Sequence, residues 1–147
     1  MSLLTDAYSD YLQSLTWDYF ATVTFEIPRR DAIRAGNSVW GVVHKAGVER
    51  AFLAVEPHET GDLHIHGLLK LSEERFSNLN YARSDLRAGG AYDLWRTVFK
   101  AFGRSKVELI NTPYHVAQYC SKYVVKGTRH QDCYNFYGQA GLWQPDY

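Results

Sequence analysis

The order in which strand-like and helix-like segments follow one another constrains the fold of this chain most. Runs rich in aromatic and β-branched residues predict strands, and apolar residues three or four apart predict helices. The predicted strands are 18–27, 50–57, 63–71 and 106–110. The predicted helices are 3–15, 29–46, 92–102 and one that begins at Pro113 and runs to about Lys126. After the first helix the order is therefore βαββαβ followed by one helix. This order predicts a ferredoxin-like α+β fold, with a central antiparallel sheet and helices packed on one face.

Two segments show no clear period and are predicted to be irregular. The polar stretch 72–90 contains the pair Gly89–Gly90, which has the character of a hinge. The tail from Arg129 onward is aromatic and rich in glycine. The turn 58–62 joins the second and third strands as a hairpin, with Gly61 available for a positive φ.

Length and composition indicate one globular domain. The 147 residues predict a single unit, with a core over about 18–127 and an aromatic tail over 128–147. Sixteen basic and 16 acidic residues give no net charge, which counts against strong non-specific binding of duplex DNA. Basic residues nevertheless gather in 100–129, and acidic residues gather in 49–62. Two cysteines and no apolar leader or membrane-length run predict a cytoplasmic protein.

A His-x-His pair in the third predicted strand is a candidate half of a metal site. His64 and His66 are two residues apart, so in a strand both imidazoles project from the same face. Glu56 lies on the partner strand of the hairpin and can add a carboxylate, while His58 and Glu59 in the turn are rivals for that role. Two histidines and one carboxylate suit Mg²⁺ or Mn²⁺ when phosphate completes the shell, and Zn²⁺ or Co²⁺ also fit.

The last predicted helix carries a doubled tyrosine–lysine pattern. Tyr119 and Tyr123 are four residues apart, and Lys122 and Lys126 follow them by three residues each, so all four share one helix face. Tyrosine can act as a covalent nucleophile, and a nearby cation favours its phenolate form. Each lysine can also stabilise negative charge on a phosphate.

Each pattern alone also fits an ordinary structural role. A His-x-His pair is common without a metal, and a helix with Tyr-x-x-Lys can pack its tyrosines on a sheet while its lysines line the solvent edge. The doubled pattern is more specific, and its place about 55 residues after a His-x-His strand is more specific still.

Taken together, these segments resemble the HUH endonucleases, the rolling-circle replication initiator (Rep) proteins. The strand 21–25 (ATVTF) is similar to the first family motif, and 63–69 (LHIHGLL) is similar to the second. The helix 116–126 is similar to the third motif, and Glu56 stands where many members have an additional acidic ligand. The resemblance covers 20–126, and the doubled tyrosine is similar to the two-tyrosine initiators.

The resemblance implies an HUH fold and a function. A tyrosine would attack a phosphodiester in single-stranded DNA, with a divalent Mg or Mn ion on His64, His66 and Glu56, and leave a 5′-phosphotyrosine link that can be rejoined. Thr22 and Thr24 of the first motif would lie near the DNA. Whether Tyr119, Tyr123 or both react stays open.

The resemblance also implies partners and a setting. The substrate would be single-stranded DNA or an origin hairpin, with a host replication helicase or polymerase as a further partner. Such a protein would be encoded by a virus or plasmid and act in the cytoplasm of its host.

Two other functions remain in view. One is a transposase or relaxase of the same superfamily, although such transposases usually have one tyrosine. The other is a nuclease-dead module that binds single-stranded nucleic acid by stacking bases on its aromatic residues. Metal-dependent cleavage of DNA separates an enzyme from the binding module.

Overall fold

The structure is a computed structural model that describes residues 3–57, 63–72, 83–119 and 134–138. The helices are α1 (Leu3–Ser14), α2 (Ala32–Lys45), α4 (Arg83–Phe102) and α5 (Pro113–Tyr119). The strands are β1 (Tyr19–Thr24), β2 (Val48–Pro57), β3 (Leu63–Leu71), β4 (Ser105–Leu109) and β5 (Tyr134–Gly138). Among the described helices, none is long and apolar enough to cross a membrane.

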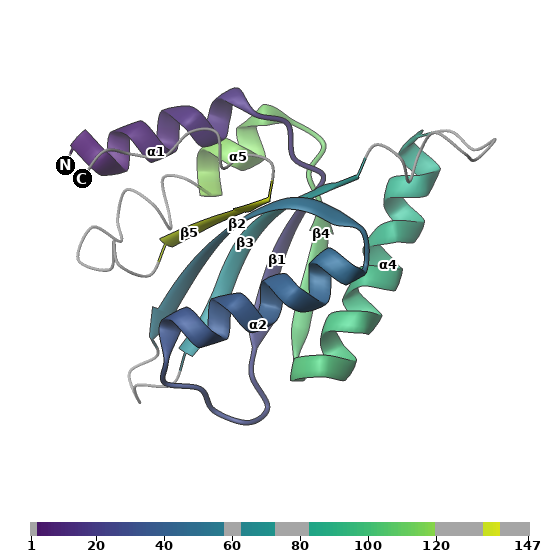
Figure 1. Cartoon of the computed structure of the whole chain (residues 1–147). Helices are drawn as coiled ribbons and strands as arrows, with labels where there is room; N and C mark the ends of the chain where they lie inside the picture. Colours follow the sequence, from purple (N-terminus) through teal and green to yellow (C-terminus); the bar gives the residue numbers. More distant parts are fainter. Residues whose placement is uncertain (1–2, 58–62, 73–82, 120–133, 139–147) are drawn as a thin grey trace.

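All five strands form one antiparallel sheet in the order β4-β1-β3-β2-β5 (Figure 1). The first four strands have the order that a βαββαβ chain gives in a ferredoxin-like fold, so the predicted α+β class is confirmed. β5 adds a fifth strand on the outer side of β2.

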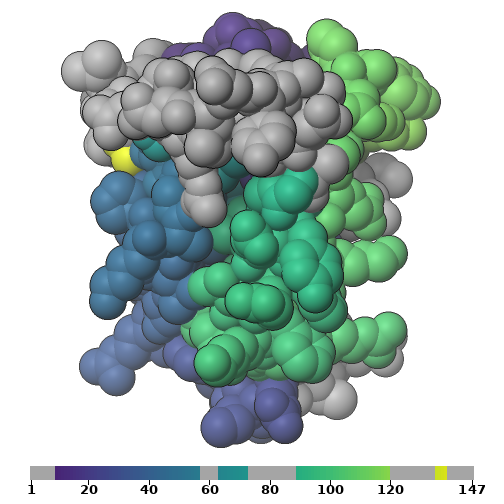
Figure 2. Space-filling model, turned by 90° about the vertical axis from the view of Figure 1, so that its right-hand side faces the viewer, coloured from purple at the N-terminus to yellow at the C-terminus, as the bar shows by residue number. Residues whose placement is uncertain are grey.

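Helices cover both faces of the sheet. The two helices inside the βαββαβ order, α2 and α4, share one face, as predicted, and pack over a large apolar core. We call this the closed face. In Figure 2 the side chains of α4 fill the middle of the surface, and lighter green side chains of β4 and α5 lie beside them.

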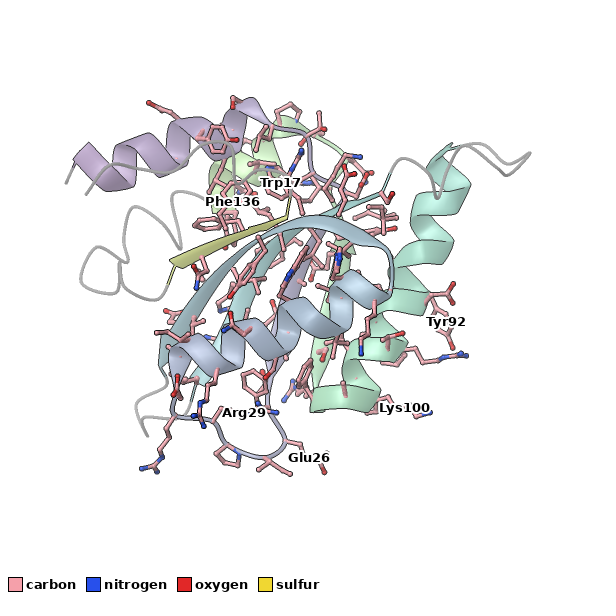
Figure 3. The ribbon with its side chains drawn as sticks, in the orientation of Figure 1. Trp17, Glu26, Arg29, Tyr92, Lys100 and Phe136 are labelled. Atoms are coloured by element: carbon pink, nitrogen blue, oxygen red, sulfur yellow. The ribbon has the colours of Figure 1, made fainter. Side chains whose placement is uncertain are left out.

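The other face, which we call the site face, carries α1 and α5 over a smaller cluster. Trp17 and Phe136 meet there, with ring centroids 6.0 Å apart (Figure 3). Phe52 and Leu68 form the floor of the same cluster. The prediction of helices on one face is therefore incomplete, because α1 and α5 lie outside the βαββαβ repeat and pack on the opposite side.

The predicted irregular stretch 72–90 is wrong in its last part, because α4 begins at Arg83. Gly89 and Gly90 lie inside this helix rather than in a hinge. A side chain at Gly90 would come within 2.5 Å of the Tyr19 hydroxyl, so this glycine lets the helix approach the sheet closely. The two glycines weaken the helical signal in the sequence, which explains why the first part of α4 was not predicted.

The tail was also predicted wrongly at one place, because 134–138 forms β5. Two successive residues of this strand point to opposite faces. Phe136 packs against the site-face cluster, and Tyr137 packs against the closed-face core. Five residues are too short for a clear period in the sequence. The predicted hairpin turn 58–62 and the last predicted helix beyond Tyr119 lie outside the described residues.

Candidate metal centre

The hairpin of β2 and β3 brings the predicted metal ligands together. Glu56 is the cross-strand partner of His64, and Ala54 is the partner of His66. Because side chains alternate along a strand, both histidines and Glu56 project from the site face. Glu56 therefore lies directly beside one imidazole and diagonally beside the other.

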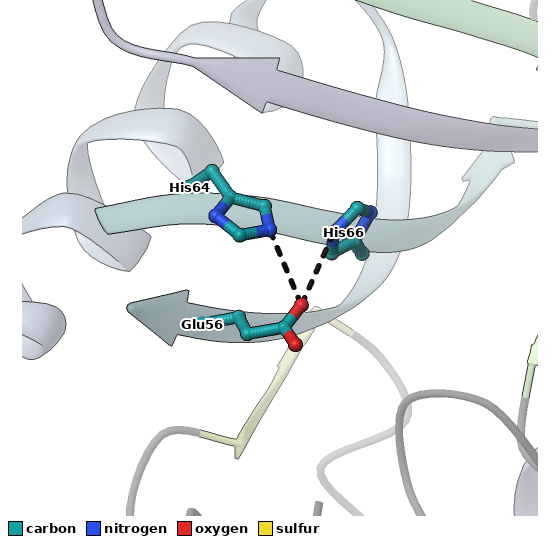
Figure 4. Close-up of side chains that lie close together, drawn as sticks. All are labelled: Glu56, His64 and His66. Carbon is teal, nitrogen blue, oxygen red and sulfur yellow. Dashed lines mark ion pairs between the residues drawn. The ribbon is translucent and has the colours of Figure 1, made fainter. Parts of the chain in front are cut away.

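The three side chains converge on one point (Figure 4). Glu56 Oε2 is 3.2 Å from His64 Nε2 and 3.3 Å from His66 Nε2. The two imidazole rings are nearly perpendicular, with centroids 4.7 Å apart. The three ligand atoms all lie within 4.8 Å of one another, so this group can hold a single metal ion.

The centre is shielded by the sheet and open on one side. The side chains of His64 and His66 are only 14% and 11% exposed, whereas that of Glu56 is 45% exposed. A cation here would keep access to solvent and to a substrate oxygen on the carboxylate side. Three protein ligands with an open position are typical of catalytic rather than structural metal sites.

Strand β1 orients the second histidine. Thr22 is the cross-strand partner of His66, and its Oγ1 lies 3.4 Å from His66 Nδ1. The ring of Phe20 stacks on the same imidazole at 6.2 Å. These contacts direct Nε2 of His66 toward Glu56, and such outer contacts fix the orientation of metal-binding histidines. Thr24, the other threonine predicted to lie near DNA, is the cross-strand partner of His64.

Helix α5 places one of the predicted nucleophiles on the same face. The Tyr119 side chain is 2% exposed, and its hydroxyl donates a hydrogen bond to the main-chain oxygen of His66 at 3.0 Å. Its ring meets Phe20 and Phe52 edge-on at 5.4 and 6.4 Å. Tyr119 thus contacts the backbone of a metal-site residue while its phenol is buried.

Several predicted site residues belong to parts of the chain that the structure does not describe. Lys122, Tyr123 and Lys126, together with the rival ligands His58 and Glu59, lie outside the described residues. Of the site residues predicted from the sequence, the structure brings five together on the site face: Glu56, His64, His66, Thr22 and Tyr119.

Sequence reasoning missed a buried ion pair on the site face. Lys70 Nζ lies 3.3 Å from Asp18 Oδ2, and each side chain is about 5% exposed. Asp18 Oδ2 also accepts a hydrogen bond from the main-chain N–H of Leu71 at 2.8 Å. The signal was a lysine in the mainly apolar second half of the strand LHIHGLLKL, four residues after His66.

A second cation on this face is held by an aromatic ring. The guanidinium of Arg50 lies over the Trp17 ring at 4.8 Å and donates to the main-chain oxygen of Thr16. Burial lowers the pKa of Arg50, and the nearby Glu49 acts in the opposite direction. Arg50 and Lys70 therefore serve the packing of the chain before β1 and lie apart from the histidine pair.

Comparison of the chain with protein-family models, with curated proteins and with solved structures gave no match. The functional argument therefore rests on the chemistry of the site.

Proposed function

We propose that this protein cuts and rejoins single-stranded DNA through a 5′-phosphotyrosine intermediate, as an initiator of rolling-circle replication. One observation carries the proposal. Glu56, His64 and His66 converge on a partly open face of the sheet, and the helix bearing the first tyrosine of the doubled motif packs on that same face. A metal-binding group beside a tyrosine-bearing helix is the arrangement that such a reaction requires.

The donor set supports a divalent cation as cofactor, Mg²⁺ or Mn²⁺ by our proposal. Two imidazole nitrogens and one carboxylate oxygen would hold it, leaving room for phosphate oxygen and water. When bound, the cation would supply electrostatic polarisation of the phosphate. Thr22 would keep His66 in place, and Thr24, the cross-strand partner of His64, would contact the bound strand.

The reaction is a transesterification. The phenolate oxygen of a tyrosine forms a bond to phosphorus while the bond from phosphorus to the 3′ oxygen of the preceding nucleotide breaks. The phenol loses its proton and the leaving 3′ oxygen gains one, so the products are a 5′-phosphotyrosine link and a free 3′-OH. Lys122 and Lys126 are proposed to stabilise the charge on the phosphate. The reverse reaction rejoins the strand.

The burial of Tyr119 favours Tyr123 as the first nucleophile. The Tyr119 hydroxyl already donates to the main-chain oxygen of His66, so it would have to leave that bond to attack. Tyr123 lies four residues further along the sequence, at the spacing that keeps two side chains on one helix face. Tyr119 would then act second, during rejoining, or only support the centre.

The proposed setting follows from the reaction. The substrate is a single strand or an extruded origin hairpin. A host polymerase would extend the free 3′-OH while a host helicase unwinds the duplex. A replicon that uses such an initiator is a virus or plasmid, and the protein would work in the cytoplasm of the host.

A direct test is an adduct assay on a library of single-stranded and hairpin DNA with Mn²⁺, and with EDTA as the control. The expected result is a covalent protein–DNA species that forms only with metal, with the modified peptide containing Tyr123 or Tyr119. An adduct on any other residue would refute the nucleophile assignment. Tight binding of single strands without an adduct would instead support the nuclease-dead binding module.

A further inference from the structure

Strand β4 forms one edge of the sheet that the described strands build. It pairs with β1 on its inner side, and within the described residues no strand adjoins its outer side. The strand has five residues, Ser105–Leu109, and Val107 is its midpoint. An antiparallel pair centred on Val107 would therefore match the whole strand with its copy.

The charged side chains of β4 would match those of a second, antiparallel copy of the same strand. Lys106 and Glu108 are exposed, stand two residues apart on the site face, and approach within 3.5 Å. In an antiparallel pair centred on Val107, Lys106 lies directly opposite Glu108 of the second copy. The symmetry produces this contact twice. Opposite charges at facing positions favour a strand pair, and like charges oppose it.

On the closed face, helix α4 carries exposed aromatic residues beside the same edge. Tyr92 and Phe99 are 59% and 50% exposed, and Trp95 lies between them with ring centroids 5.9 and 5.4 Å away. We call these three residues the aromatic row. Trp95 Nε1 donates to the main-chain oxygen of Ser105 at 3.0 Å, which fixes the row against the start of β4.

The aromatic row faces away from the core. Figure 3 shows Tyr92 projecting outward from α4, on the side away from α2. Figure 2 shows α4 uncovered over the middle of this surface. An apolar row next to a strand edge that no described strand covers is typical of a surface that becomes buried on association.

We propose that the outer edge of β4 and the aromatic row form a twofold interface between two copies of this chain. The twofold axis would run perpendicular to the sheet, midway between the two Val107 residues, giving one continuous antiparallel sheet of two copies. The aromatic rows of the two α4 helices would face each other across the axis. A self-complementary patch of this kind is what a twofold interface requires.

A second copy fits better than another partner because of the charge pattern. A strand edge that is only protected against association typically carries lysine or proline. Here the lysine is matched by a glutamate at the position that symmetry places opposite it. The interface would leave both metal centres on the same side of the joined sheet, because an axis perpendicular to a sheet preserves its faces.

The test measures the mass of the full chain in solution by sedimentation velocity, without DNA or metal, up to about 100 μM protein. The wild type is expected to be dimeric. Lys106→Glu and Glu108→Lys should each raise the dimer dissociation constant roughly tenfold or more, because each places like charges opposite each other twice. A wild type that stays monomeric up to that concentration overturns the proposal.

Two combinations make the test specific for the β4 register. The double variant Lys106→Glu/Glu108→Lys should dimerise like the wild type, since it restores opposite charges. The two single variants mixed in equal amounts should form a heterodimer that neither forms alone. Failure of both rescues would show that the proposed register is wrong.

The aromatic row is tested with a matched surface variant. Phe99→Glu should dissociate the dimer, whereas Ile33→Glu, at an exposed apolar position on α2, should not. Circular dichroism would verify that both variants fold. Equal effects of the two substitutions would overturn the role of the aromatic row. None of these measurements depends on nicking, so they stand whatever the adduct assay shows.

Discussion

The two faces of the sheet are built from the same strands and serve different purposes. On the closed face, residues such as Val23, Leu53 and Ile65 are almost fully buried beneath α2 and α4. On the site face, Thr22, Thr24 and His64 are only partly buried, although they adjoin the closed-face residues in sequence. The closed face therefore carries the larger apolar core, and the site face carries the polar groups of the candidate metal centre.

The difference teaches how a small domain can hold costly polar groups. Glu56, His64 and His66 are anchored by strands whose opposite side is packed with apolar residues. Burial of apolar side chains contributes about 1.5–3 kcal/mol for each large residue, so one closed face can offset several polar residues on the other. The comparison predicts that substitutions on the closed face lower stability alone, whereas substitutions on the site face also change metal binding or adduct formation.

The largest effect is expected at the metal group. His64→Ala with His66→Ala should remove metal binding and lower adduct formation on the order of a thousandfold, because two of the three ligands are lost. The fold should persist, since neither side chain belongs to an apolar core. Manganese binding by calorimetry and thermal unfolding would be measured together. His115→Ala, at an exposed histidine on α5, is the matched control. Normal cutting by the double variant would exclude this group as the metal site.

The buried ion pair of the site face should matter next. Asp18→Asn replaces the charged partner of the buried Lys70 with a neutral amide and should lower the free energy of unfolding by about 3–5 kcal/mol. Urea unfolding measures this loss. Adding Lys70→Met should recover most of it, because the charge is then removed. If the double variant is no more stable than Asp18→Asn alone, the loss has another cause.

Neighbouring leucines in β3 compare the two faces directly. Leu68 lies in the site-face cluster and Leu69 in the closed-face core, and both are almost fully buried. Either change to alanine should cost about 2–5 kcal/mol of stability. Only Leu68→Ala should also weaken manganese binding, because Leu68 shares its cluster with Tyr119. Equal loss of metal affinity in both variants would mean that the faces are not functionally separate.

The smallest effect is expected at Tyr119. Tyr119→Phe removes the hydrogen bond to the main-chain oxygen of His66 and should cost about 1 kcal/mol of stability. Manganese affinity should fall a few-fold while an adduct still forms on Tyr123. Tyr114→Phe, on the exposed side of α5, should change neither quantity. Complete loss of the adduct in Tyr119→Phe alone would instead identify Tyr119 as the first nucleophile.

Much of the fold could be predicted because its signals are local. The strand LHIHGLLKL forms over its predicted bounds 63–71, and the run rich in aromatic and β-branched residues before Pro28 forms a shorter strand, Tyr19–Thr24, inside its predicted bounds 18–27. The start of α4 and the strand β5 could not be predicted in the same way. Gly89 and Gly90 oppose a helix locally, and the close approach of Gly90 to Tyr19 is a tertiary contact that no local pattern reports.

The sequence by itself determined which residues can make a metal site and which strands carry them, because spacing within a strand fixes the face of each side chain. Only the tertiary structure decided that Glu56 reaches both imidazoles, that Thr22 contacts His66, and that Tyr119 lies buried against its backbone. The contacts of Thr22 and Tyr119 with His66 join residues 44 and 53 positions apart, and that of Glu56 joins two strands across the sheet. Their distances depend on strand register and helix packing, which are set by the whole core rather than by any local pattern.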